Sequence, residues 1–216
     1  MDVCSIISPI RLLGSLSSYN NSQIAADKGN KSLIQALYQY VITKIRGDGI
    51  RLGEIVHIQK GKQINGECLS SMGPYYVMNG GITPSGYYSQ FNTQANTISI
   101  SEGGNSCGYV KYNEKPYWSG GHCYSLLNAS PIVDYRFLFH ALKYHQDDIM
   151  ALRIGSGLPN IQKKDIENFP IMLPSLDEQK RYASFFDALS SRLNIAEQIR
   201  ANYEAQKKYL ILNLFI

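Results

Sequence analysis

The 216-residue sequence has no run of about 18 apolar residues and no cysteines at CxxC spacing. The first absence predicts that no helix spans a membrane. The second leaves the cysteines without the spacing of a zinc ribbon or a dithiol redox site. The apolar pair Ile6-Ile7 is too short for the core of a signal peptide, and the acidic Asp2 precedes it. We therefore expect a cytoplasmic protein with reduced thiols. The four cysteines are Cys4, Cys68, Cys107 and Cys123.

Motifs of the common nucleotide-dependent enzymes are also missing. There is no Gly-rich cofactor loop after a strand and no Asn/Asp-Pro-Pro-aromatic motif, which a base methyltransferase would need. The run GGNSCG at 103–108 lacks the Lys and Ser/Thr of a phosphate-binding loop and favours a tight turn between strands. Glu102 is a single carboxylate with no evident partner in the sequence. These absences favour a non-catalytic recognition module.

A cysteine–histidine site is the alternative chemistry. His57, His122, Cys107 and Cys123 could in principle bind zinc or form a Cys–His pair. However, Cys107 lies beside a glycine turn, Cys123 begins an apolar segment, and no third ligand lies at a typical interval. We expect buried thiols and no metal.

The composition is that of a globular protein with a mildly basic surface. Hydrophobic residues make up 44% and charged residues 18%, and the net charge is +4 with a pI near 8.8. This charge permits nucleic acid as a partner without requiring it. The 16 tyrosines greatly outnumber the 7 phenylalanines. Because tyrosine combines a large, fairly rigid surface with a hydroxyl group, this bias suits recognition loops as well as a core.

Turn residues and hydrophobic periodicity divide the chain into three segments. Residues 1–49 contain a loosely patterned stretch and a short amphipathic helix at about 31–46, closed by the linker GDG at 47–49. Residues 50–174 form a globular domain in which short strands are followed by a helix at about 135–152. The expected strands are 54–58, 75–78, 97–101, 108–112 and 123–127. Trp118 is expected to be a core anchor rather than a stacking platform.

Residues 175–216 predict one long helix. Ser175 and Glu178 form a capping box, and neither Pro nor Gly follows before Ile216. A helix of about 40 residues spans roughly 60 Å and suits a spacer of the coiled-coil type. An amphipathic helix packed on its own domain is the alternative. The heptad positions are Tyr182, Phe186, Leu189, Leu193, Ala196, Tyr203, Leu210 and Leu214.

Several motifs occur in an order that resembles a known family. LGEI at 52–55 and KGK at 60–62 are followed by YVMNGGI at 76–82, PSGY at 84–87, ISISEGG at 98–104 and SCGYV at 106–110. GSGLPNI at 155–161 and PIMLPSLDEQ at 170–179 then lead into the helix. The chain resembles a half-length specificity (S) subunit of type I restriction–modification systems, with one target-recognition domain. The resemblance implies an α+β fold in which a mixed α/β recognition domain precedes the long spacer helix.

The resemblance also implies the role and the partners. Such a subunit is not an enzyme; it reads half of a bipartite double-stranded DNA target and docks methyltransferase (M) subunits, and through them restriction (R) subunits. S-adenosylmethionine, ATP and Mg²⁺ are expected only on those partners. A half-length form would act as a homodimer or pair with another half subunit. The alternative is a protein- or glycan-binding module dimerised by its C-terminal helix.

Loop positions suggest which side chains would contact DNA. Lys and Arg would contact phosphates, while Asn, Gln, Ser, Arg and Tyr side chains would read base edges. Lys163 and Lys164 are the preferred pair, because they follow the glycine turn at 155–157. The candidates are Lys60, Lys62, Asn79, Ser85, Tyr87, Tyr88, Asn105, Ser106, Lys111, Lys115, His122, Arg153, Ser156, Lys163 and Lys164.

Overall fold

The computed structural model describes residues 32, 36, 39–155 and 157–214. The chain divides into two compact units, one formed by Ile42–Ala183 and the other by Met1–Val41 with Ser184–Ile216. Residues 39–44 are helical, in agreement with the predicted helix at 31–46. The expectation for residues 1–30 and most of the first half of that helix lie outside the described residues.

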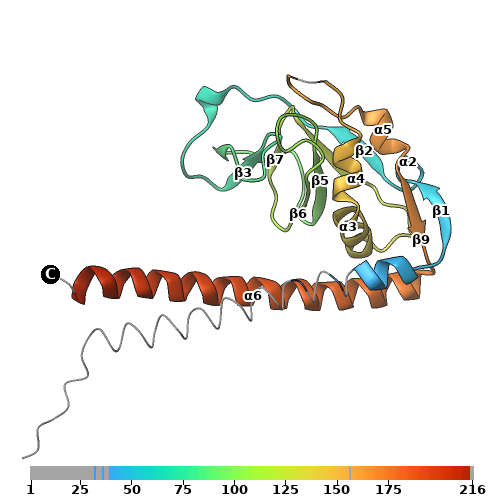
Figure 1. Ribbon diagram of the computed structural model, residues 1–216. Coiled ribbons are helices and arrows are strands. Elements are labelled where there is room, and N and C mark those ends of the chain that lie inside the picture. Colours follow the sequence, from blue (N-terminus) through green and yellow to red (C-terminus); the bar gives the residue numbers. More distant parts are fainter. Residues whose placement is uncertain (1–31, 33–35, 37–38, 156, 215–216) are drawn as a thin grey trace, which may run out of the picture. The chain divides into compact units, whose positions relative to one another are not determined.

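A four-stranded antiparallel sheet forms the centre of the larger unit (Figure 1). Its order is β2 (His57–Lys60), β8 (Cys123–Leu127), β5 (Thr97–Ser101) and β6 (Val110–Asn113). All five residues of β5 are buried. Ile98 and Ile100 belong to the hydrophobic core, whereas Ser99 on the opposite face accepts a hydrogen bond from Asn113 Nδ2 at 2.9 Å. The strand is therefore buried on both faces, one apolar and one polar.

Short strands complete the sheets. A three-stranded sheet has the order β4 (Gly86–Tyr88), β3 (Tyr75–Met78) and β7 (Trp118–Ser119), with β3 and β7 parallel. A separate ladder pairs β1 (Asp48–Arg51) with β9 (Pro170–Leu173). The sequence patterns predicted β3, β5 and β8 with their observed bounds. They missed the other strands here, which have two to four residues each and too little length to show a period.

The helices of the larger unit are short. They are α2 (Leu52–Ile55), α3 (Tyr135–Tyr144), α4 (Gln146–Ala151) and α5 (Lys163–Glu167), with a 3₁₀ turn at Gly66–Cys68. The Asp134 carboxylate caps α3 by accepting a hydrogen bond from Phe137 N at 2.8 Å. Leu138 and Leu142 on α3 join the core that covers the apolar face of the central sheet.

Three predicted bounds are wrong. The strand at 54–58 is replaced by α2 and by β2, which starts at His57. The helix at 135–152 is interrupted at His145, which is the C-cap of α3 and the N-cap of α4. β6 begins at Val110 instead of 108, because Gly108 has a φ of +89° and a Cβ there would lie 2.7 Å from Met150 Cα. Each difference follows from packing that a local sequence pattern does not encode.

The long C-terminal helix is confirmed. α6 runs from Leu176 to Leu214, and its 39 residues span about 58 Å at ~1.5 Å per residue. Glu178 Oε2 accepts hydrogen bonds from Ser175 N at 3.1 Å and from Ser175 Oγ at 2.6 Å. The carboxylate therefore reaches back to Ser175 as predicted, while the hydroxyl donates to that carboxylate instead of accepting from a helix N–H. These hydrogen bonds lower the pKa of Glu178.

Gln179 holds the start of α6 to the rest of the larger unit. It is 1% exposed, and its Nε2 donates to Ile132 O at 3.0 Å and to Pro174 O at 2.8 Å. Its Oε1 accepts from Asp134 N at 2.8 Å, directly before α3. One turn later, Ala183 joins a small apolar cluster with Phe137 and Ala141.

Replacing Gln179 with leucine should destabilise the larger unit by about 2–4 kcal/mol. Leucine preserves the size of the side chain but leaves the buried Pro174 carbonyl, and the partly buried hydrogen-bonding groups of Asp134 and Ile132, without this partner. Chemical denaturation monitored by circular dichroism measures the change. Gln198→Leu, at an exposed position of the same helix, is the control and should change stability by less than about 0.5 kcal/mol. Equal stability of the two variants would contradict the anchoring role of Gln179.

The predicted heptad positions of α6 differ in exposure. Phe186 is buried, the side chains of Tyr182, Leu189, Leu193, Ala196 and Leu210 are partly buried, and Tyr203 is 37% exposed. The side chain of Leu214 is outside the described set. A neighbouring row of apolar residues on α6 was not predicted from the heptad. Its members Phe185, Ile195 and Ile199 are 40%, 55% and 49% exposed. Among the described residues, no helix is long and apolar enough to cross a membrane.

Candidate nucleic-acid interface

Loops that are distant in the sequence converge around Glu102, at the end of β5. Glu102 N donates to His122 O at 2.9 Å, and Ile161 N donates to Glu102 O at 2.8 Å. The loop after β2 joins them, because Lys62 N donates to Ser119 O at 2.8 Å. The loop after β3 is tied in by Asn79 Oδ1, which accepts from His122 N at 3.1 Å. We call residues 60–63, 79–81, 101–104, 119–122 and 158–161 the Glu102 loop cluster.

The Glu102 carboxylate is the buried charge of this cluster. Its Oε1 accepts from Lys60 Nζ at 2.7 Å and from Tyr124 OH at 3.0 Å. The residue is 9% exposed, whereas the side chains of Lys60 and His122 are 54% and 61% exposed. Burial, and next the charge of Glu102, raise the pKa of the Tyr124 hydroxyl, which therefore stays a hydrogen-bond donor at neutral pH. The arrangement holds a negative carboxylate beneath exposed cationic and imidazole groups.

Glycines allow these loops to approach closely. A Cβ on Gly120 would lie 2.5 Å from Asn79 Oδ1, and a Cβ on Gly61 would lie 2.1 Å from Gly120 O. Gly80 has a φ of +85°, a conformation that other residues rarely adopt. The glycine turns noted in the sequence therefore pack the loops against one another and fix where their polar side chains emerge.

An aromatic pair borders the cluster. Trp118 Nε1 donates to Lys62 O at 2.9 Å, and the Trp118 ring meets the edge of Tyr88 with centroids 5.1 Å apart. Trp118 is only partly buried, so the prediction of a core anchor is wrong; its neighbour Tyr117 is fully buried instead. Tyr117 directly precedes β7 in a bridge with Thr93, and the alternation of adjacent side chains in extended backbone explains the exchange.

The structure brings together only some of the predicted DNA contacts. Lys60, Lys62, Asn79 and His122 belong to the Glu102 loop cluster, and Tyr88 borders it through Trp118. Asn105 and Ser106 lie on the adjoining turn, which Gly104 N ties to Pro159 O at 3.0 Å. The remaining candidates lie elsewhere or carry internal contacts.

Besides Lys60, which pairs with Glu102, two further predicted lysines are engaged within the chain. Lys111 is partly buried, with Nζ 3.5 Å from Met78 Sδ and 5.5 Å from the Tyr76 ring centroid. Lys163 pairs with Glu167 at 3.3 Å on α5, whereas Lys164 is exposed. The side chains of Ser85, Lys115 and Arg153 are exposed, Tyr87 is partly buried in β4, and Ser156 is outside the described residues.

Sequence reasoning missed the partners of Glu102. Lys60 lies 42 residues before it and Tyr124 lies 22 residues after it, so no spacing rule connects them. Gln63, Trp118 and Asn160 also belong to or border the cluster without having been candidates. The one usable signal was the concentration of glycine-rich turns at 79–81, 103–104 and 120–121.

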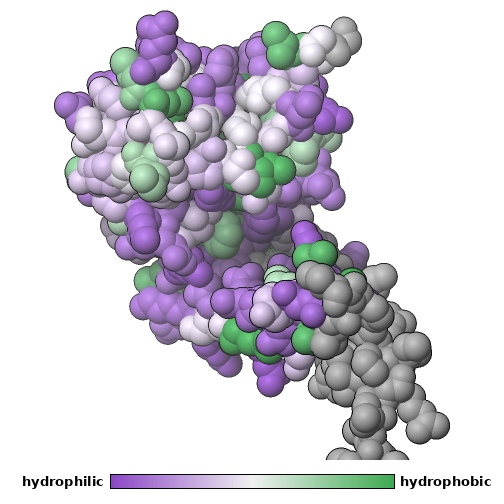
Figure 2. Space-filling view, turned by 90° about the vertical axis from the view of Figure 1, so that its left-hand side faces the viewer, coloured by the Kyte–Doolittle hydropathy of each residue, from purple (hydrophilic) through white to green (hydrophobic). Residues whose placement is uncertain are grey.

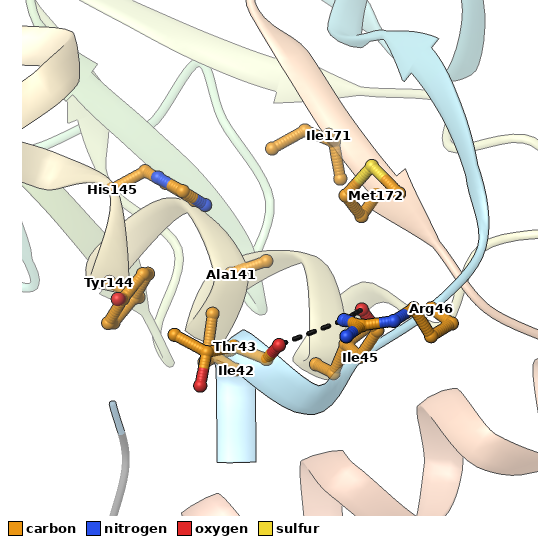
Figure 3. Close-up of a pocket in the computed structure, with 9 residues that line it drawn as sticks. All are labelled: Ile42, Thr43, Ile45, Arg46, Ala141, Tyr144, His145, Ile171 and Met172. Atoms are coloured by element: carbon orange, nitrogen blue, oxygen red, sulfur yellow. Dashed lines mark hydrogen bonds between the residues drawn. The ribbon is translucent and has the colours of Figure 1, made fainter. Parts of the chain in front are cut away.

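The face of the molecule in Figure 2 carries mainly hydrophilic side chains, with hydrophobic ones scattered among them. The cavity of about 400 Å³ in Figure 3 has a different character. Its walls include Ile42, Ile45 and Ile171 together with polar side chains, among them Arg46, whose Nη1 donates to Thr43 O at 2.9 Å. Nothing in its lining pairs a nucleophile with a base, so it offers no evident catalytic chemistry.

The cysteines of the proposed alternative site are buried thiols, as expected. Cys107 is 0% exposed and Cys123 is 2% exposed, and burial raises the pKa of the Cys123 thiol to about 11. Cys107 Sγ donates to Glu102 O at 2.9 Å. In the described parts of the chain, His, Cys, Asp and Glu residues form no group of three that could hold a metal ion.

Comparison with known proteins identifies the family. Residues 48–205 match the type I restriction modification DNA specificity domain. Type I specificity subunits of Mycoplasma pneumoniae and Mycoplasma genitalium are 36% and 33% identical; each alignment covers 73% of this chain, but 43% and 42% of the relative. The chain thus spans about two fifths of their length.

Solved structures share the fold. The S subunit of the type I restriction–modification system from M. genitalium superimposes with a TM-score of 0.78 at 21% identity, covering 97% of this chain and 60% of that one. The HsdS subunit from Thermoanaerobacter tengcongensis gives 0.65 at 18% identity, covering 96% and 56%. The family match over residues 48–205 and the similarity to the two mycoplasma subunits show that this chain belongs to the type I restriction modification DNA specificity domain family.

Proposed function

We propose that this chain is a non-catalytic DNA-recognition subunit that reads one half of a bipartite target. The observation that carries the proposal is the Glu102 loop cluster, where exposed Lys60, Lys62 and His122 lie on loops that meet around the buried Glu102 side chain. Ammonium groups suit the phosphate backbone, and amide, imidazole and carboxylate groups suit base edges. The family membership supports this role.

The long helix supplies the second part of the proposal. α6 would set the distance between two half-sites and present surface to methyltransferase subunits. One recognition domain reads one half-site, so a working complex would need two copies, or one copy and a different half subunit. Identical copies related by a two-fold axis would read an inverted repeat. Restriction subunits would join through the methyltransferase, and S-adenosylmethionine, ATP and Mg²⁺ would belong to those partners.

The proposal is tested by DNA binding at increasing salt. The target would first be found by methylome sequencing of cells with and without the gene. The complex of this chain with its cognate methyltransferase subunit would then be titrated with target and scrambled duplexes between 50 and 200 mM salt. We expect preference for the target and a steep fall in affinity, because released counterions drive phosphate binding. Salt-independent binding, or none, would favour a protein- or glycan-binding module instead.

The polypeptide alone should transfer no methyl groups to DNA. The reason is that its sequence lacks a cofactor loop and the cavity of Figure 3 lacks a catalytic pair. Radiolabelled S-adenosylmethionine with target DNA measures the activity before and after addition of the cognate methyltransferase subunit. Incorporation above background without that subunit would contradict a non-catalytic role.

A further inference from the structure

One buried oxygen of the Glu102 loop cluster has no partner. Glu102 Oε1 accepts two hydrogen bonds, whereas Oε2 accepts none among the described residues although it is inaccessible to solvent. Buried polar atoms are nearly always hydrogen-bonded, and leaving one unsatisfied costs about 1–3 kcal/mol. The Glu102 side chain is 11% exposed and one of its oxygens is unused by the described residues, so this oxygen is available to a donor from a ligand.

Among the residues that the structure describes, none supplies that donor. Lys60 Nζ and Tyr124 OH both bind the other oxygen. His122 Nδ1 lies 4.0 Å from Oε2, beyond hydrogen-bond distance. The His122 side chain is 61% exposed and can therefore change its rotamer, so that a ligand could approach Oε2 from the side on which the imidazole now lies.

We infer that Glu102 Oε2 accepts a hydrogen bond from the exocyclic amino group of a target base, N4 of cytosine or N6 of adenine. This inference rests on the proposed function. In the major groove those two groups are donors, whereas O6 of guanine and O4 of thymine are acceptors that a carboxylate repels. Lys60 offsets the negative charge at 2.7 Å, and the exposed Lys62 can contact a nearby phosphate. The carboxylate can thus approach DNA without a net repulsive charge.

A purely structural role is the rival explanation. Glu102 could serve only to position Lys60, in which case removing either partner would weaken DNA binding equally for every sequence. A base-reading role predicts instead that Glu102 controls the preference at one base pair. The two roles therefore predict different effects of a Glu102 substitution on base preference, even where they predict the same loss of overall DNA affinity.

The experiment uses the complex with the methyltransferase subunit and its methylated target. Each cytosine or adenine of one half-site is replaced, one at a time, by 2-pyrimidinone or purine, which lack the exocyclic amine. The wild-type complex should lose affinity roughly 10- to 100-fold when the analogue stands at one such position. The Glu102→Gln complex should bind the analogue and the natural base at that position with equal affinity. The analogue that produces the loss identifies cytosine or adenine. Lys60→Met should lower affinity uniformly, and Glu54→Gln, at an exposed carboxylate on α2, should change nothing.

Clear outcomes would overturn the inference. Glu102→Gln and Lys60→Met could give the same uniform loss with unchanged base preference, which would make Glu102 a positioning residue. If Glu102→Gln fails to fold, the wild-type analogue series still decides, since an effect below about threefold at every position rules out an amine contact. Wild type that binds no DNA would refute the proposed function itself, whereas wild type that binds with no Glu102-dependent position refutes only this inference.

Discussion

Replacing Leu189 and Leu193 with glutamate should weaken assembly with a second copy or with the methyltransferase subunit at least 100-fold. The two leucines lie four residues apart, on one face of α6, and both are partly buried. Burying a leucine contributes about 1.5–3 kcal/mol, and each glutamate adds a charge that would have to be desolvated. Sedimentation of the chain alone, and co-purification with the methyltransferase subunit, measure the loss.

A matched control lies on the opposite face of the same helix. Ser191→Glu with Gln198→Glu adds the same charge at two exposed positions and should leave assembly unchanged. The larger unit should stay folded in both variants, as judged by its thermal transition. Unchanged mass and intact methyltransferase binding in the leucine variant would show that the heptad face is not the interface. The exposed row that includes Ile195 and Ile199 would then be the face to vary next.

Deleting residues 194–200 should shorten the gap between the two half-sites by about three base pairs. Seven residues correspond to roughly 10 Å of helix and two nearly whole turns, so the apolar face is preserved while the spacer shortens. One base pair rises about 3.4 Å along the duplex. The bases read should not change, because the Glu102 loop cluster lies outside α6. Methylome sequencing of cells carrying the deletion measures both the gap and the half-sites.

A five-residue deletion, 194–198, separates spacing from helix phase. It changes the length less but turns the following apolar residues by about 140° onto a different face, so we expect loss of methylation instead of a new gap. An unchanged gap in the seven-residue deletion would contradict the spacer model. So would half-site bases that vary with helix length, or a continuous methylated motif.

The sequence by itself determined the elements whose causes are local. β3, β5 and β8 have their predicted bounds because runs of residues that favour β-strands lie between turn residues. The long helix followed from an uninterrupted stretch without Pro or Gly and from the reach of Glu178 back to Ser175. The ordered motifs also indicated the family. All of these signals act over a few residues and can be read along the chain.

Only the tertiary structure decided which side chains meet. The break at His145, the exchange of Tyr117 for Trp118 in the core and the Lys163–Glu167 pair depend on packing around them. The surroundings of Glu102 depend on loops that meet only in the fold. Its partners come from 42 residues before and 22 residues after it, and its Oε2 is inaccessible to solvent without a partner among the described residues. Spacing along a sequence carries no information about such an encounter, since the fold creates both the contact and the low-dielectric surroundings that make it matter.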